Sequence, residues 1–146
     1  MKKILFMLAV CFALISCGTD NKSESSEQVS KEVTMKDHVE VLYFHGKQRC
    51  PTCIAIENNT KTAIEENFAE EMKSGNVEFK IIDISKTENE NIAEKYEVTW
   101  SSLFVVKYKA GKETSENMTE FAFGNARKSP DAFKAEIVKT VNDMLK

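Results

Sequence analysis

Residues 39–53 read VEVLYFHGKQRCPTC, an apolar run followed by a short polar segment and two cysteines. Val39 to Phe44 is rich in β-branched and aromatic side chains, which predicts a strand that is buried on both faces. Pro51 suits the first position of a helix, where its missing N–H has no helical partner to lose. The pattern therefore predicts a strand that leads into a helix, with Cys50 and Cys53 at the start of that helix.

The remaining hydrophobic pattern predicts a further alternation of helices and strands. Apolar side chains at four-residue steps predict that the first helix covers residues 51–73 and is ended by residues 74–76. Alternating apolar and charged residues predict a second strand over residues 77–84. Thr87 and Glu90 have the spacing of a capping box, which predicts that a short second helix follows.

The C-terminal third of the chain adds two strands and a helix. Residues 103–106 form the third predicted strand, and residues 110–112 offer a hairpin turn into a weaker fourth strand that ends near residues 118–123. Ser129 as a cap and Pro130 as the first helical residue predict a last helix that runs to the C-terminus. The order β-α-β-α-β-β-α predicts an α/β fold with a mixed four-stranded sheet and helices on both faces.

Composition narrows the class of protein. The chain has 146 residues, of which 42% are hydrophobic and 29% are charged, as is ordinary for one globular domain. Its 20 basic and 23 acidic residues give a net charge of −3, without the basic excess that attracts nucleic acid. We therefore expect one domain over residues 38–146, which is a monomer and has no nucleic-acid partner.

The first 37 residues have the pattern of a targeting segment and a tether. Lys2-Lys3 precede an apolar run over residues 4–15, which is shorter than the roughly 20 residues of a membrane-spanning helix. Leu14-Ile15-Ser16-Cys17 resembles the lipobox of bacterial lipoproteins, in which cleavage precedes the cysteine and its sulfur carries a diacylglycerol. We expect a lipoprotein signal peptide over residues 1–16, a lipidated Cys17 with a flexible tether to residue 37, and a location outside the cytoplasm, on a membrane of the bacterial cell envelope. The alternative is a plain secretory signal.

Cys50 and Cys53 have the spacing of a redox pair. Two cysteines three residues apart at a helix start lie on one edge of the first turn, where free N–H groups and the helix dipole favour a thiolate. Cys50 follows Lys47 and Arg49 and is the candidate nucleophile, and Cys53 would resolve the mixed disulfide.

Two other interpretations of the cysteine pair stay open. The pair can form an inert structural disulfide, or it can supply half of a metal site. A structural zinc needs about four ligands. His38 and His45 are the only histidines, so we expect no metal site.

The order of elements, with Cys-Pro-Thr-Cys where the first strand meets the first helix, resembles the thioredoxin-like superfamily along essentially the whole folded part. The resemblance implies exchange of disulfides with protein clients and no organic cofactor. In that superfamily a cis-proline opens the third strand and faces the cysteines. Aligning Tyr96-Glu97-Val98 with the usual aromatic-glycine-aliphatic lead-in places Ser102 at that position. The superfamily's buried acid, six residues before the first cysteine, is replaced by Phe44.

Two further residues are candidates for supporting roles, each with an alternative. His45 is a candidate proton shuttle because imidazole titrates near neutrality, or it is a capping or surface histidine. Trp100, in the loop that faces the cysteines, is either a docking residue for clients or a core residue.

The sequence thus predicts a membrane-tethered thiol–disulfide oxidoreductase, with a non-enzymatic binding module that carries a structural disulfide as the alternative. The predicted catalytic residues are Cys50 and Cys53, the predicted supporting residues are His45, Arg49, Pro51 and Ser102, and Trp100 is the predicted docking residue.

Overall fold

The computed structural model describes residues 36–146. Cys17 and the predicted signal peptide therefore lie outside the described residues. The elements, in chain order, are β1 His38–His45, α1 Pro51–Asn67, α2 Ala69–Ser74, β2 Val77–Asp83, the 3-10 helix η1 Thr87–Asn89, α3 Glu90–Lys95, β3 Ser102–Lys109, β4 Lys112–Asn117, α4 Thr119–Asn125 and α5 Pro130–Leu145.

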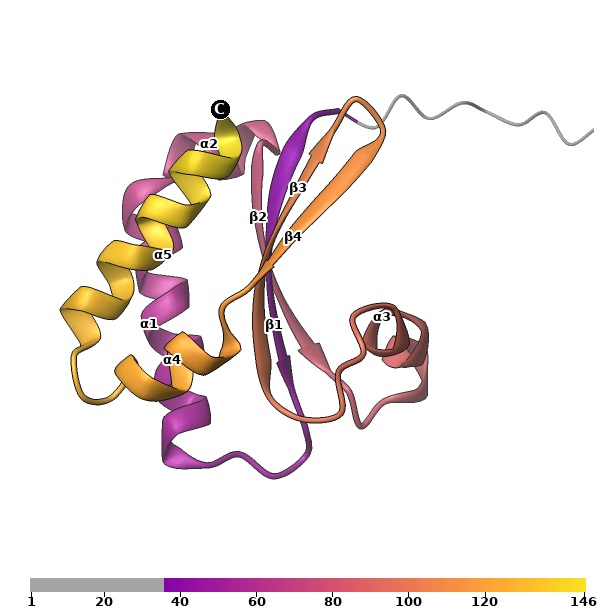
Figure 1. The fold of residues 1–146 in the computed structure, drawn as a ribbon, viewed down its shortest axis with the longest axis vertical. Coiled ribbons are helices and arrows are strands. Elements are labelled where there is room, and N and C mark those ends of the chain that lie inside the picture. Colours follow the sequence, from indigo (N-terminus) through magenta and orange to yellow (C-terminus); the bar gives the residue numbers. More distant parts are fainter. Residues whose placement is uncertain (1–35) are drawn as a thin grey trace, which may run out of the picture. The chain divides into compact units, whose positions relative to one another are not determined.

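The four strands form one mixed sheet in the order β2-β1-β3-β4. β1 pairs in parallel with β2 and antiparallel with β3, and β4 pairs antiparallel with β3. Helices α1, α2, α4 and α5 lie on one side of the sheet, and α3 lies on the other (Figure 1). The predicted α/β architecture, with a mixed four-stranded sheet between helices, is confirmed.

β1 is one of the two central strands, and its side chains alternate between two hydrophobic clusters. Val39, Val41 and Tyr43 belong to the larger cluster, which also contains residues of α1 and α5. Leu42 and Phe44 belong to a smaller cluster with residues of β2 and β3, against which α3 packs. β1 is therefore buried on both faces, as predicted, and Tyr43 and Phe44 point to opposite faces of the sheet.

The first helix is shorter than predicted. α1 ends at Asn67, and Phe68 leaves the helical conformation with φ −130° and ψ 28° before α2 begins. Phe68 is buried in the larger cluster, so the break places a large side chain in the core at the point where the chain turns towards β2. The predicted end of the helical region is correct, because Gly75 adopts the left-handed φ of 72° that ends α2.

The predicted extension of the fourth strand to residues 118–123 is wrong. β4 ends at Asn117, and the residues that follow form α4. Phe121 and Phe123 suggest the two-residue period of a strand, but the fully buried residues here are Ala122 and Ala126, which are four residues apart. That period belongs to a helix packed on the core, and it decides the local structure.

The two predicted side-chain caps are not present. Thr87 begins η1 without a capping bond, and the preceding turn is closed by Ser85, whose N–H and hydroxyl both donate to the Asp83 carboxylate, at 3.0 Å and 2.7 Å. Pro130 is the first residue of α5 as predicted, but Ser129 makes no side-chain capping bond within residues 36–146.

Candidate functional site

The two cysteines lie at the start of α1, as predicted. Cys50 is the N-cap residue with an extended backbone (φ −76°, ψ 160°), and its sulfur accepts a hydrogen bond from the Cys53 N–H at 3.0 Å. A disulfide joins the two residues, whose Cα atoms are 5.0 Å apart. Cys50 is exposed, whereas Cys53 is 6% exposed. The first sulfur therefore meets solvent at the positive end of the helix dipole, and the second is covered.

Tyr43 lies directly behind the cysteine pair. Its side chain is fully buried, and its hydroxyl donates to the Cys53 carbonyl oxygen at 2.7 Å. Burial raises the pKa of Tyr43, and hydrogen bonds with Arg49 and Ser101 only partly offset that effect. The phenol therefore remains a protonated donor at neutral pH.

Tyr43, and not Phe44, occupies the position behind the cysteines. Phe44 stands six residues before Cys50, but it points into the cluster on the α3 side of the sheet. The side chain that reaches Cys53 comes from Tyr43, seven residues before Cys50. The group behind the cysteines is therefore a phenol, and the position of Phe44 is not the one that faces them.

Arg49 is paired with an acid that the sequence analysis did not single out. Its guanidinium hydrogen-bonds the carboxylate of Glu57 on α1, and it lies over the Tyr43 ring, 5.8 Å from the centroid. Burial opposes the charge of Arg49, but the bonds to Glu57 and Tyr43 outweigh it and raise the pKa of Arg49. The positive charge of Arg49, which was predicted to favour a Cys50 thiolate, is thus paired with Glu57. The available signal was spacing, because Glu57 follows Cys53 by four residues, one helical turn.

His45 lies at the end of β1 and is partly buried. Its Nδ1 is 2.9 Å from the Gly46 carbonyl oxygen, and its ring centroid is 6.1 Å from that of Tyr43. Within residues 36–146 no hydrogen bond connects His45 to either cysteine. A role in proton transfer stays a prediction.

The loop before β3 contributes Trp100 and two serines. Ser102 is the first residue of β3, is 6% exposed, and donates from its hydroxyl to the Trp100 carbonyl oxygen at 3.2 Å. Trp100 is 58% exposed, and its ring lies 5.2 Å from that of Phe123 on α4. Its exposure excludes the core interpretation. A cavity of about 550 Å³ adjoins it and is lined by Tyr96, Glu97, Val98, Trp100, Ser102, Phe104, Asn117, Thr119, Glu120 and Phe123.

Glu97 has the backbone conformation of a glycine. Its φ of 53° lies in the left-handed region, which glycine adopts without strain. Glu97 is the residue that the alignment of Tyr96-Glu97-Val98 placed at the usual glycine. The placement of Ser102 at the position of the cis-proline stays a prediction.

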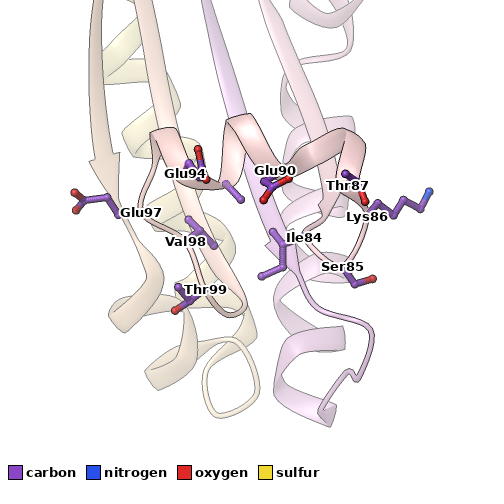
Figure 2. A pocket seen from close by; sticks show the side chains of 10 residues that line it. Ile84, Ser85, Lys86, Thr87, Glu90, Glu94, Glu97, Val98 and Thr99 are labelled. Carbon is purple, nitrogen blue, oxygen red and sulfur yellow. The ribbon is translucent and has the colours of Figure 1, made fainter.

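A second cavity, of about 730 Å³, lies beside α3 (Figure 2). It is lined by residues 84–87, by Glu90, Ala93 and Glu94 of α3, and by residues 97–99. Figure 2 shows the side chains of Lys86 and Glu97 pointing outward, away from Ile84 and Val98. No cysteine lines this cavity, and residues 36–146 contain no cluster of acidic, histidine or cysteine side chains arranged to hold a metal. It is separate from the cysteine site.

Comparisons with known proteins find distant structural likenesses only. No protein-family model and no curated protein sequence matches this chain. Among solved structures, the chain is similar to an uncharacterised thioredoxin-like protein from Clostridium perfringens, with 13% identity, 84% of this chain and 94% of that chain covered, and a TM-score of 0.48. It is also similar to chloroplastic thioredoxin z (19% identity, 82% and 92% covered, TM-score 0.47) and to a thioredoxin from Thermus thermophilus (16% identity, 73% and 72% covered, TM-score 0.44).

The chain thus combines a mixed four-stranded sheet between helices with a Cys50–Cys53 disulfide at the start of α1. Within the part of the chain that the structure describes, no helix is long and apolar enough to cross a membrane.

Proposed function

We propose that this protein is a thiol–disulfide oxidoreductase that exchanges disulfide bonds with protein clients through Cys50 and Cys53. One observation carries the proposal: Cys50 is exposed and its sulfur caps the start of α1 by accepting the Cys53 N–H, while Cys53 is buried. A helix start favours a thiolate, and the difference in exposure gives each sulfur its own role.

The exchange needs two steps and no organic cofactor. In the reduced protein the Cys50 thiolate attacks a client disulfide, so that a Cys50–client bond forms and one client thiolate leaves. The Cys53 thiolate then attacks the Cys50 sulfur, which forms the Cys50–Cys53 disulfide and releases the second client thiolate. The two protons lost by the cysteines go to the client thiolates. The reverse sequence oxidises a client.

The proposed clients are proteins, and the proposed docking residue is Trp100. A large aromatic side chain that is more than half exposed beside a cavity is the kind of residue that anchors protein interfaces. The loop from Thr99 to Ser102 would then hold the client next to Cys50.

The alternative function is a binding module whose disulfide only stabilises the fold. The observation that favours it is the group behind Cys53, because the Tyr43 phenol stays protonated and cannot take the Cys53 proton at neutral pH. The reduction potential separates the two functions, since a structural disulfide is expected below about −300 mV and an exchanging one above it.

A trapping experiment tests the proposed exchange. In reduced protein at neutral pH, an alkylating reagent should label Cys50 faster than Cys53, and Cys53→Ser should accumulate a mixed disulfide with clients. Cys50→Ser is the matched control and should trap nothing, because the remaining sulfur is covered. Equal and slow labelling of both cysteines, with no trapped client, would establish the binding module instead.

We also propose that the protein acts outside the cytoplasm, tethered to a membrane of the cell envelope through lipidated Cys17. Cys17→Ser should release the protein from membranes, because the lipid contributes about 0.8 kcal/mol of membrane affinity per buried methylene. The melting temperature should not change, because Cys17 lies in the segment proposed to be a tether. Cys11→Ser is the matched control, because Cys11 lies in the peptide proposed to be removed. Membrane partitioning that is unchanged in Cys17→Ser would refute the anchor.

A further inference from the structure

Three polar side chains from three different elements meet behind the cysteine pair. Tyr43 comes from β1, Arg49 from the loop that precedes Cys50, and Glu57 from α1. The Arg49–Glu57 ion pair is largely shielded, with side-chain exposures of 27% and 18%. Arg49 also lies over the Tyr43 ring, whose hydroxyl binds the Cys53 carbonyl. The cluster therefore includes Arg49, the residue before Cys50, and it contacts the backbone of Cys53 through Tyr43.

We propose that Glu57 is a positioning residue that acts through Arg49 and limits how readily Cys50 ionises. The inference rests on the proposed function, because it concerns the nucleophile of that exchange. A guanidinium beside a thiol favours the thiolate. Glu57 offsets that effect in two ways: its negative charge compensates the positive charge of Arg49, and its hydrogen bond holds the guanidinium against α1 and Tyr43.

The surroundings of Arg49 fix this arrangement. Its Nε is buried and has no hydrogen-bond partner among residues 36–146, so the guanidinium is held by its bond to Glu57 and its contact with Tyr43. Tyr43 is fully buried and cannot move aside. The ion pair is thus partly buried against the core residue Tyr43 and differs from a fully exposed surface pair, which contributes little.

The other charged groups near Cys50 are few. Lys47 of the same loop is exposed, and His45 at the end of β1 is partly buried. On neighbouring elements, Asp83 ends β2 beside His45, and Glu120 of α4 lines the cavity next to Trp100. The loop from Thr99 to Ser102 carries no charge. Arg49 precedes Cys50 directly in sequence, and Arg49 and Glu57 are the ion pair that contacts Tyr43, the residue whose hydroxyl binds the Cys53 carbonyl.

The test is the pH profile of Cys50 alkylation in the reduced full-length protein with iodoacetamide. Glu57→Gln keeps an oxygen that accepts a hydrogen bond from Arg49 but removes the negative charge. The midpoint of the profile should fall by about half a pH unit, so that alkylation below the midpoint is about threefold faster, as one unit charge in partly exposed surroundings produces. Glu66→Gln, the same charge change at an exposed position later in α1, should leave the midpoint unchanged.

Removing the cation gives the opposite sign and an independent check. Arg49→Gln leaves the Glu57 charge uncompensated, so the midpoint should rise. The double variant Arg49→Gln with Glu57→Gln removes both charges and should return the midpoint close to that of the unaltered protein. A Glu57→Gln midpoint that stays or rises, or single variants that shift in the same direction, would overturn the inference.

The experiments distinguish failure of the proposed exchange from failure of the proposed role of Glu57. Iodoacetamide is a small molecule, so the midpoint is independent of any client. If Cys53→Ser traps clients but the Glu57→Gln midpoint does not fall, exchange stands and the role of Glu57 is wrong. If the midpoints shift as expected but no client is trapped, the proposed exchange with proteins is wrong and the electrostatic role of Glu57 stands.

Discussion

Replacing Glu97 with glycine should stabilise the protein. Glu97 adopts φ 53°, and the left-handed conformation costs a residue with a Cβ roughly 1–2 kcal/mol. Glycine avoids that strain but loses about 0.5–1 kcal/mol more conformational entropy on folding than alanine. The side chain of Glu97 is exposed, and its backbone N–H bond to the Glu94 carbonyl does not depend on the side chain. The net gain is about 0.5–1 kcal/mol, which in a domain of this size raises the melting temperature by roughly 2–6 °C.

Thermal unfolding followed by circular dichroism measures this effect, and two controls separate backbone strain from charge. Glu97→Gln removes the same charge but keeps the left-handed strain, so its melting temperature should not rise. Glu94→Gly places glycine within α3, where it should destabilise by about 0.5–1 kcal/mol. A Glu97→Gly variant that is destabilised as much as Glu94→Gly would refute the strain argument.

Three further predictions concern the hairpin, an exposed ion pair and the loop before β3. Ala110 has φ 51° in the turn between β3 and β4, so Ala110→Asn, which tolerates this conformation, should raise the melting temperature by roughly 2 °C in the same assay. Partial burial raises the pKa of Glu113, but hydrogen bonds from Lys95 and Tyr96 outweigh it and hold that pKa below its ordinary value of 4.5. The ionised Glu113 therefore contributes free energy of unfolding above pH 4.5, and this contribution is lost as the pH falls through the lower pKa of the folded state. Glu113→Gln should reduce the difference in urea midpoint between pH 7 and pH 3. Ser102→Pro should change the rate at which Cys53→Ser traps clients more than it changes the melting temperature, because proline is tolerated at a strand start, and an unchanged rate would show that Ser102 does not face the docking site.

The elements that the sequence predicted well are those whose own residues decide them. β1 is a mostly apolar run of β-branched and aromatic residues that favours a strand buried on both faces, and Gly75 ends α2 through a backbone conformation that glycine favours. The errors fall where packing decides. Residues 118–123 fit a strand or a helix by pattern, and contact of Ala122 with the core selects the helix.

The candidate site divides in the same way. Cys50, Cys53 and Pro51 are found by spacing alone, because their positions around a helix start follow from local geometry. Tyr43 and Glu57 were not found, because their contacts depend on the rotation of α1 over β1 and on the length of the connecting loop. The rotation is set by the packing of the whole larger cluster, so the four-residue spacing from Cys53 can suggest Glu57 as a candidate but cannot predict its contact with Arg49.

The loop before β3 is held by its own side chains. Ser102 bonds the Trp100 carbonyl, and Trp100 packs on Phe123 of α4. Ser101 of this loop is buried and acts to lower the pKa of Tyr43, whose hydroxyl binds the Cys53 carbonyl. The buried phenol therefore lies between the start of α1 and the loop before β3.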